Sequence, residues 1–142
     1  MCTIPHTKVL TIDSDPCHLQ AALKELTPFL AKTGFSDKTV QSLLVALGEA
    51  ATNASRHSYG CEKGRPIEIT LEDSSEKLVI RIRDFGTKID LRAVKEPVIP
   101  PVKGGGLGIY FMKTIMDDLK YNTAHPKGNE LIMTKYKGKD SE

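Results

Sequence analysis

Two neighbouring segments near the middle of the chain alternate apolar and polar residues, and this feature constrains the fold most. Residues 67–72 place isoleucine or leucine at every second position between glutamate and threonine, and residues 78–83 repeat the pattern with valine and arginine between the apolar positions. Because successive side chains of a strand point to opposite faces, each segment has one apolar face and one face that suits water. A polar turn at residues 73–76 joins them, so the sequence predicts an antiparallel hairpin in a sheet that is covered on one side.

Three amphipathic segments supply helices that could cover such a sheet. The first begins at Asp15, an N-cap residue followed by proline, and its leucines recur at helical spacing before Gly34 ends it. The second begins at Ser36, keeps the helical period for about four turns, and ends at Gly60. The third is expected over residues 107–117.

Further strands are predicted near both ends of the chain. Residues 8–12, 119–123 and 131–136 are rich in apolar and β-branched residues, and a turn with proline and glycine separates the last two. The resulting order of elements predicts an α+β two-layer sandwich, with a mixed, mainly antiparallel sheet and helices on one face. Residues 85–106 are expected to form a long connection with a short helical piece near residues 91–94.

Composition narrows the class of protein. The 142 residues suit one domain over residues 1–142, with a frayed polar tail at 137–142. Twenty Lys and Arg against eighteen Asp and Glu leave a net charge of +2, which is too small to indicate nucleic acid as a partner. No apolar run approaches the ~20 residues of a membrane span, so we expect a cytoplasmic protein without membrane attachment. Three cysteines without CxxC spacing indicate neither a disulfide framework nor a zinc site.

The second predicted helix carries the first pattern that suggests chemistry. Glu49, Asn53 and His57 follow one another at intervals of four residues. Glu49 and Asn53 therefore share one helix face, because four residues advance about 40° around the axis. A carboxylate can accept a proton, and an amide oxygen one turn away can ligate a hard cation such as Mg²⁺. Taken alone, the pattern fits an ordinary solvated helix face at least as well.

A second pattern follows the hairpin directly, where Asp84 and Gly86 come after its second strand. A carboxylate held at a strand end beside a permissive glycine suits recognition of an exocyclic amine, such as that of adenine. The alternative is a turn residue that caps the next segment.

The third pattern is the glycine segment Gly104-Gly105-Gly106-Leu107-Gly108, which opens the third predicted helix. Glycines let backbone N–H groups approach phosphates, a helix N-terminus favours negative charge, and Lys103 adds a cation. The segment is neither a Walker P-loop nor a Rossmann fingerprint, because no GK[ST] follows and a proline-containing loop precedes it. A flexible hinge is the alternative interpretation.

Together, these three patterns resemble the ATP-binding motifs of one superfamily. Residues 49–59 (Glu-Ala-Ala-Thr-Asn-Ala-Ser-Arg-His-Ser-Tyr) resemble the N-box of the GHKL ATPase and kinase superfamily, and more narrowly the E-A-x-T-N-A-x-x-H-x-Y of bacterial anti-sigma factor serine-protein kinases. Residues 84–90 occupy the place of their D-x-G-x-G-I-x-D box, and residues 104–109 with 116–118 resemble their G-G-x-G-L/I segment and the following helix. Glu49 opens this N-box, whereas the N-box of sensor histidine kinases usually begins with histidine. The resemblance covers roughly residues 8–136.

The resemblance implies a Bergerat-type ATP site over the sheet, closed by a lid at about residues 91–103. It implies that Glu49 is the general base for a serine hydroxyl and that Asn53 ligates Mg²⁺. It also implies that Asp84 binds the adenine amine and that Gly86 lets the base approach. The remaining contacts with ATP would come from His57, Lys103, Gly104, Gly105, Gly106, Leu107 and Gly108. Phosphoryl transfer suits such a site, since it depends mostly on positioning and on neutralisation of charge.

The sequence departs from the family pattern at two places. Lys88 replaces the second glycine of the adenine box and narrows the edge of the expected pocket. Asn129 and Glu130 stand where the family usually places a threonine near the adenine.

The resemblance implies a function as well as a fold. A kinase of this type phosphorylates a small STAS-type anti-anti-sigma protein and sequesters a sigma factor, and a homodimer through the first strand and helix is expected by analogy. An alternative is a nucleotide-dependent binding module that switches partners without transferring phosphate, since the pocket edge is altered. A helper domain of a larger histidine-kinase-like protein is a third possibility, although the sequence supplies no phosphoaccepting dimerisation helix.

Overall fold

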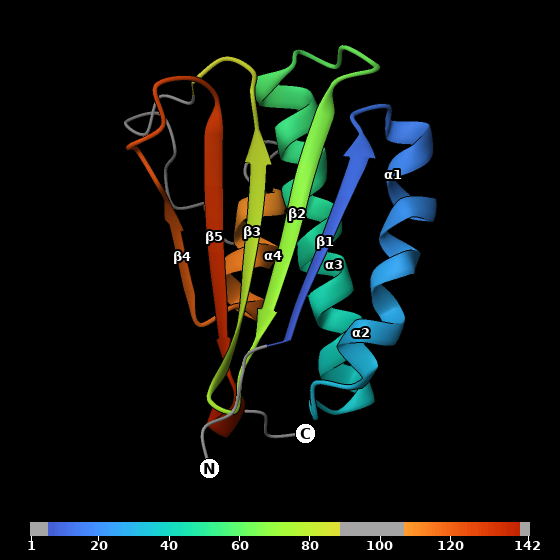
Figure 1. Cartoon of the computed structure of the whole chain (residues 1–142), viewed down its shortest axis with the longest axis vertical. Helices are drawn as coiled ribbons and strands as arrows, with labels where there is room; N and C mark the ends of the chain where they lie inside the picture. The colour runs from blue at the N-terminus through green and yellow to red at the C-terminus, as the bar shows by residue number, and fades with distance from the viewer. Residues whose placement is uncertain (1–5, 89–106, 140–142) are drawn as a thin grey trace.

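The computed structural model describes residues 6–88 and 107–139, which are coloured in Figure 1. The predicted lid, the helical piece near residues 91–94, and the site residues Lys103, Gly104, Gly105 and Gly106 lie outside the described residues. Every strand and helix predicted within the described ranges is present. The elements are β1 (His6–Asp13), α1 (Pro16–Leu23), α2 (Thr27–Ala31), α3 (Asp37–Asn53), β2 (Pro66–Asp73), β3 (Lys77–Asp84), α4 (Leu107–Ile115), β4 (Asp118–Tyr121) and β5 (Asn129–Tyr136), with the short turns η1 (Lys24–Leu26), η2 (Ala54–Ser58) and η4 (Lys137–Lys139).

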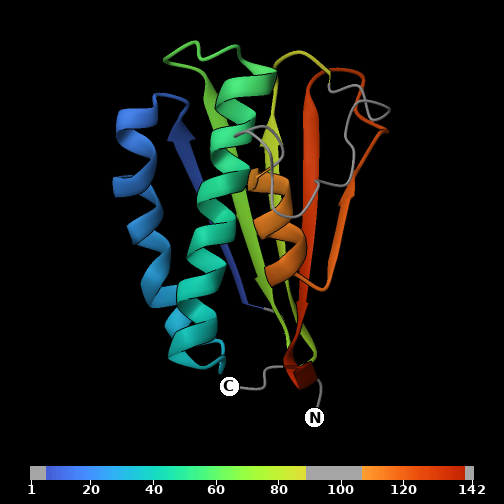
Figure 2. The same cartoon turned by 180° about the vertical axis from the view of Figure 1, so that it is seen from behind.

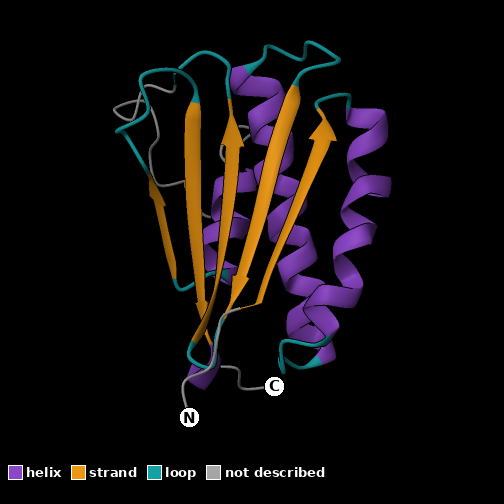
Figure 3. Ribbon diagram, in the orientation of Figure 1, coloured by secondary structure: helices purple, strands orange, loops and turns teal. Residues whose placement is uncertain are grey.

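The strands form one five-stranded sheet in the order β1-β2-β3-β5-β4. The sequence predicted a mixed, mainly antiparallel sheet. In the structure, every pairing between the described strands is antiparallel. The described helices lie on one face of this sheet (Figures 1 and 3), and turning the molecule by 180° brings them to the front (Figure 2). The predicted α+β two-layer fold is confirmed. None of the described helices combines the length and apolar character needed to cross a membrane.

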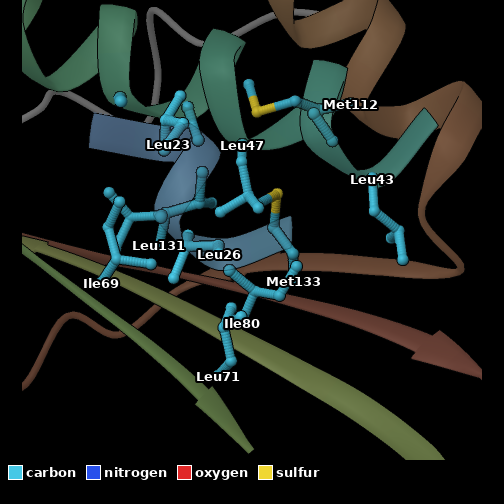
Figure 4. Close-up of a cluster of buried hydrophobic side chains, with 14 of the residues drawn as sticks. Leu23, Leu26, Leu43, Leu47, Ile69, Leu71, Ile80, Met112, Leu131 and Met133 are labelled. Atoms are coloured by element: carbon cyan, nitrogen blue, oxygen red, sulfur yellow. The ribbon is translucent and has the colours of Figure 1, made fainter. Parts of the chain in front are cut away.

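The core lies between the sheet and the helices (Figure 4). Alternate positions of β2, β3 and β5 face the helices, as the sequence pattern predicted. Burial of this apolar surface is the main driving force for packing the two layers together. Fully buried side chains shown in Figure 4 are Leu26, Leu43, Leu47, Ile69, Leu71, Ile80, Met112 and Met133.

The same alternation carries two polar residues into the buried face of the sheet. Asp84 continues the series of Ile80 and Ile82 at the end of β3. Asn129 lies opposite Asp84 at the start of β5, and the two residues are only 3% and 5% exposed. A buried carboxylate requires hydrogen-bond donors around it, so this end of the sheet must supply them.

The first predicted helix is divided into two. α1 ends at Leu23, η1 follows, and α2 then begins at Thr27. Pro28 lies in the first turn of α2. Because proline has no N–H to donate to the carbonyl four residues earlier, the α-helical hydrogen-bond pattern is interrupted at this point.

The chain after β5 begins in an ordered turn. Lys137 starts η4, and its Nζ lies 2.9 Å from Oδ1 of Asp73. The same ammonium donates to the carbonyl oxygen of Thr33 at 2.5 Å and lies 5.4 Å from the centre of the Phe35 ring. This first part of the predicted frayed tail is therefore held against the rest of the fold, and residues 140–142 lie outside the described residues.

Candidate functional site

The last turns of α3 carry the predicted catalytic and metal-binding residues. Glu49 and Asn53 are both half-buried there, and the alanines at positions 46, 50 and 54 are buried. α4 packs against α3 (Figure 2), and Leu107 and Gly108 form its first turn. The predicted phosphate-binding segment thus leads into the helix that packs against α3, the helix that carries Glu49 and Asn53.

Directly after Asn53 the helix widens into a π-helical turn, η2. The Tyr59 backbone N–H donates to the Ala54 carbonyl oxygen at 3.2 Å, which is the i→i+5 bond that defines this geometry. The sequence predicted an unbroken helical period as far as Gly60. His57 lies within this π turn, and its side chain is exposed.

Hydrogen bonds from Ser55 and to Ser55 hold the π-helical turn η2 in place. The Ser55 hydroxyl donates to the carbonyl oxygen of Ser14, just after β1, at 2.7 Å. The Cys61 backbone N–H donates to the Ser55 carbonyl at 2.8 Å. Ser14 in turn accepts at its hydroxyl from the Arg65 N–H at 3.1 Å, so β1, the turn and the start of β2 are held together.

The Asp84 carboxylate is surrounded by donors from three segments. Its Oδ2 accepts from the Ser58 hydroxyl at 2.9 Å. Its Oδ1 accepts from the Gly86 backbone N–H at 3.0 Å and from the Asn129 side-chain amide at 3.1 Å. Burial raises the pKa of the Tyr121 phenol on β4, and the charge of Asp84 raises it further.

Gly86 packs against the end of the helix. A Cβ at this position would lie 2.2 Å from the Ser58 carbonyl oxygen and 2.8 Å from the Tyr59 ring. The Thr87 N–H donates to that same Ser58 oxygen at 2.8 Å. Because Gly86 has no Cβ, the Ser58 backbone can lie directly against it. This close contact brings the end of β3, with Asp84, against the end of the helix.

Tyr59 connects this contact to β2. Its hydroxyl donates to the Pro66 carbonyl oxygen at 2.6 Å and accepts from the Phe85 N–H at 2.8 Å. Burial raises the pKa of this hydroxyl, although the bond from Phe85 acts in the opposite direction. The Arg65 guanidinium lies over the Tyr59 ring, 4.4 Å from its centre.

A pocket of about 520 Å³ opens beside this contact. His57 and Gly86 of the predicted site line it, whereas Glu49, Asn53 and Asp84 do not. Among the described residues, the lining consists of His57, Ser58, Tyr59, Gly60, Glu62, Arg65, Phe85, Gly86, Thr87 and Lys127.

The two departures from the family pattern have definite contacts. The Lys88 ammonium donates to the His125 carbonyl oxygen at 2.5 Å, so this exposed side chain extends to the β4–β5 connection. Glu130 accepts from the Asn122 amide at 2.9 Å and lies 3.0 Å from Nε2 of His125. Burial raises the pKa of Glu130, but these two side-chain hydrogen bonds, together with the charge of Arg81, hold it below its usual value.

The sequence did not identify every residue around Asp84. Asn129 was noted only as a substitute for the family's threonine, and Ser58 was not assigned a role. Asn129 lies two residues before the apolar Leu131, so strand alternation alone places it on the buried face. A buried amide needs hydrogen-bond partners. The expected burial of Asn129 is therefore the feature of the sequence that could have suggested a contact with Asp84.

The fold and the arrangement of these residues can be compared with known protein families. Residues 12–135 match the family model described as a histidine kinase-like ATPase domain.

Individual relatives are more specific. The serine-protein kinase RsbW of Listeria innocua is 30% identical over 140 residues, which cover 92% of this chain and 88% of the relative. The serine-protein kinase RsbW of Oceanobacillus iheyensis is 30% identical over 135 residues, covering 89% of this chain and 84% of the relative. The chain therefore belongs to the histidine kinase-like ATPase family, in the group that contains these serine-protein kinases.

The residues present fit the ATP that this family binds. A carboxylate offers about four acceptor positions, and the described residues donate three hydrogen bonds to Asp84. A further acceptor position of this carboxylate would suit an N–H of the adenine amine. No group of three metal-ligating His, Cys, Asp or Glu side chains occurs in the described part of the chain. Asn53 fits the way Mg²⁺ usually binds beside nucleotides, through one or two protein oxygens and the phosphates.

Proposed function

We propose that this protein is an ATP-dependent serine-protein kinase of the anti-sigma type. The observation that carries the proposal is the position of Glu49, a half-buried carboxylate one helical turn before Asn53 on the helix that leads to the Asp84 site. The similarity to serine-protein kinases over 92% of the chain supports the same activity.

Each proposed role follows from the chemistry of the side chain. Glu49 accepts the proton of the substrate serine while the serine oxygen forms a bond to the γ-phosphorus and ADP leaves. The side-chain oxygen of Asn53 would hold Mg²⁺, which would supply positive charge to offset the negative charge of the phosphates. Asp84 accepts a hydrogen bond from the adenine amine, with Gly86 holding the backbone beside it.

The remaining proposed contacts come from a residue that lines the pocket and from the segment that precedes α4 and forms its first turn. His57 lies at the pocket wall. The backbone N–H groups of Gly104, Gly105, Gly106, Leu107 and Gly108, with the ammonium of Lys103, bind the phosphates.

The proposed partners are a STAS-domain anti-anti-sigma protein as the phosphoryl acceptor and a sigma factor as a bound target. We further propose a homodimer and a cytoplasmic location, where both partners and ATP would be met.

The test is transfer of labelled γ-phosphate from ATP to the cognate STAS-domain protein. Glu49→Gln should lower the rate at least about a hundredfold, since it removes the base without changing the size of the side chain. Glu68→Gln, a change at an exposed position of β2, is the matched control and should leave the rate unchanged. Equal rates for Glu49→Gln and the wild-type protein would contradict the assigned role.

A non-catalytic partner switch is the second candidate, favoured by the replacement of the family's glycine and threonine by Lys88 and Asn129. It predicts that nucleotide changes affinity for the partner while no phosphoprotein forms. The same mixture of proteins, analysed both for phosphoserine and for complex formation, distinguishes the two functions.

A further inference from the structure

The pocket beyond the ends of α3 and β3 carries charged groups that the proposed function does not use. Its volume of about 520 Å³ lies in the range that small ligands occupy. It is found at the end of the sheet that is uppermost in Figure 1, and Glu49, Asn53 and Asp84 do not line it. A ligand in this pocket would therefore not need the groups assigned to the serine, the metal and the adenine amine.

Arg65 is a cation of this pocket whose position is fixed by its neighbours. Its guanidinium carbon lies 4.4 Å from the centre of the Tyr59 ring. One terminal nitrogen donates to the Glu62 carboxylate at 2.8 Å, and the other lies 3.5 Å from the Phe85 carbonyl oxygen. A guanidinium has more N–H groups than these contacts use. Its planar fork can hold two oxygens of one phosphate or carboxylate group.

The carboxylate that pairs with Arg65 can be displaced at little cost. The side chain of Glu62 is 60% exposed and that of Arg65 is 35% exposed. An ion pair open to solvent contributes little stability, because water solvates both groups. An anion that enters the pocket can therefore replace Glu62 on the guanidinium, while Glu62 turns toward solvent.

A second cation of the pocket comes from a distant segment. Lys127 lies in the connection between β4 and β5, and its side chain is exposed. Within the part of the chain that the structure describes, its ammonium forms no hydrogen bond or ion pair. Two cations on one pocket suit a group with two negative charges better than a single carboxylate. A phosphate monoester carries about two negative charges at neutral pH.

The rest of the lining suits the organic part of such a ligand. The rings of Phe85 and Tyr59 are apolar, and Thr87 offers a hydroxyl that can donate to an oxygen. Gly60 and Gly86 have no side chains that would fill the space. Ligand sites commonly combine apolar walls with a few polar groups in this way.

We propose that this pocket binds a phosphomonoester through Arg65 and Lys127, and that the ligand replaces Glu62 on Arg65. The phosphoryl group belongs either to a phosphorylated side chain of a protein or to a free phosphorylated compound. Binding is non-covalent and does not require ATP, so the inference goes beyond the proposed function.

The test is a titration of the isotope-labelled full chain with N-acetyl-O-phosphoserine amide, followed by NMR. The backbone amide signals of Gly60, Gly86 and Thr87 should shift and saturate. N-acetylserine amide, which lacks the phosphate, should leave them unchanged. Inorganic phosphate should bind at least about threefold more weakly, because it has no organic part to contact Phe85. No saturable shift with the phosphoserine compound, or equal affinity for inorganic phosphate, would overturn the proposal.

A third probe distinguishes the two sources of the phosphoryl group. Free O-phosphoserine carries a charged amine and a carboxylate that the blocked compound lacks. Tighter binding of the free form would support a small-molecule ligand in this pocket. Tighter binding of the blocked form would support a phosphorylated side chain of a protein.

Matched variants test the two cations separately. Arg65→Gln should weaken binding of the blocked phosphoserine at least about tenfold, the scale of a charge-assisted contact. Arg56→Gln is its control, since Arg56 is exposed on η2 but does not line the pocket. Lys127→Gln should weaken binding about threefold, the scale of a contact open to solvent. Lys63→Gln, at an exposed position outside the lining, is its control. Equal effects of the lining variants and their controls would contradict the site.

The variant Glu62→Gln separates ligand binding from a structural role. It removes the competing carboxylate, so it should strengthen binding at least about threefold. A merely structural role of the pair with Arg65 would instead leave binding unchanged or weaken it, and this result would overturn the proposed exchange.

A titration in the presence of saturating ATP without Mg²⁺ separates this pocket from the proposed nucleotide site. ATP would occupy the predicted phosphate-binding segment but leave the pocket open. Shifts of Gly60 and Thr87 that persist with ATP support the proposal. Shifts that disappear with ATP and persist in Lys127→Gln would place the probe in the nucleotide site and overturn it. A protein that binds no ATP would refute the proposed function, while the variants of Arg65 and Lys127 would still decide this inference.

Discussion

Replacement of Gly86 by alanine should destabilise the fold through one identifiable clash. The new Cβ would lie 2.2 Å from the carbonyl oxygen and 2.6 Å from the carbonyl carbon of Ser58, and 2.8 Å from the Tyr59 ring. Ordinary contacts of a Cβ begin at 3.4 Å. The atoms of Ser58 are backbone and cannot rotate away, so the segment after β3 must move by about 1 Å to relieve the overlap.

The cost follows from the hydrogen bonds that this movement breaks. They join the Gly86 N–H to Asp84 at 3.0 Å, the Thr87 N–H to Ser58 at 2.8 Å, and the Asn129 amide to the Thr87 carbonyl at 2.9 Å. At about 1 kcal/mol of net stability for each bond, Gly86→Ala should lower the free energy of unfolding by about 3 kcal/mol. The melting temperature should fall by roughly 10 °C.

Urea unfolding followed by circular dichroism measures this change. Gly138→Ala is the control, because a Cβ at Gly138 would meet no atom within 4 Å. The slope of the free energy against urea concentration should be the same in both variants, so that the midpoints compare stability directly. A change below about 0.5 kcal/mol for Gly86→Ala, the size expected at a surface position, would refute the packing argument.

Three further variants can be measured by the same unfolding method. Gly48→Ala should raise the free energy of unfolding by about 1 kcal/mol, since alanine favours the helix and its Cβ would approach no atom outside α3 closer than 3.5 Å. Gly128→Ala should lower it by at least about 2 kcal/mol, because φ there is +76° and the Cβ would lie 2.1 Å from a carbonyl oxygen of β3. Burial raises the pKa of Glu130, but hydrogen bonds from Asn122 and His125 outweigh this effect and lower the pKa in the folded state below its ordinary value. The ionised carboxylate therefore stabilises the fold at neutral pH. This stabilisation is lost as the pH falls through the pKa that Glu130 has in the folded protein. Glu130→Gln should therefore be less stable than the wild-type protein at neutral pH, and the difference should disappear in acid; a difference that is independent of pH would contradict this account.

Most of the fold could be predicted from the sequence because its determinants are local. The alternation in residues 67–72 and 78–83 identified β2 and β3 and assigned their buried faces correctly. The N-caps Asp15 and Ser36 accept hydrogen bonds at the starts of α1 and α3, as expected. The interruption at Pro28 was visible in the sequence, but the leucine periodicity continues through it and concealed the break.

The candidate site was less predictable because its geometry depends on contacts between distant segments. The π-helical turn after Asn53 is held by Ser14, which lies 41 residues from Ser55 in the sequence. The pairing of Asn129 with Asp84 requires β5 to lie beside β3, an order that no local pattern specifies. By contrast, the spacing of Glu49 and Asn53 is a property of one helix and could be read directly.

Calorimetric titration with ATP, with and without Mg²⁺, tests most directly whether α3 and Asp84 form the nucleotide site. The wild-type protein should bind ATP more tightly when Mg²⁺ is present, by at least about tenfold for a charge-assisted ligand set. Asn53→Ala should lose this gain while its metal-free affinity for ATP stays close to that of the wild-type protein. The same gain from Mg²⁺ in Asn53→Ala and in the wild-type protein, or no ATP binding by the wild-type protein at all, would contradict the account.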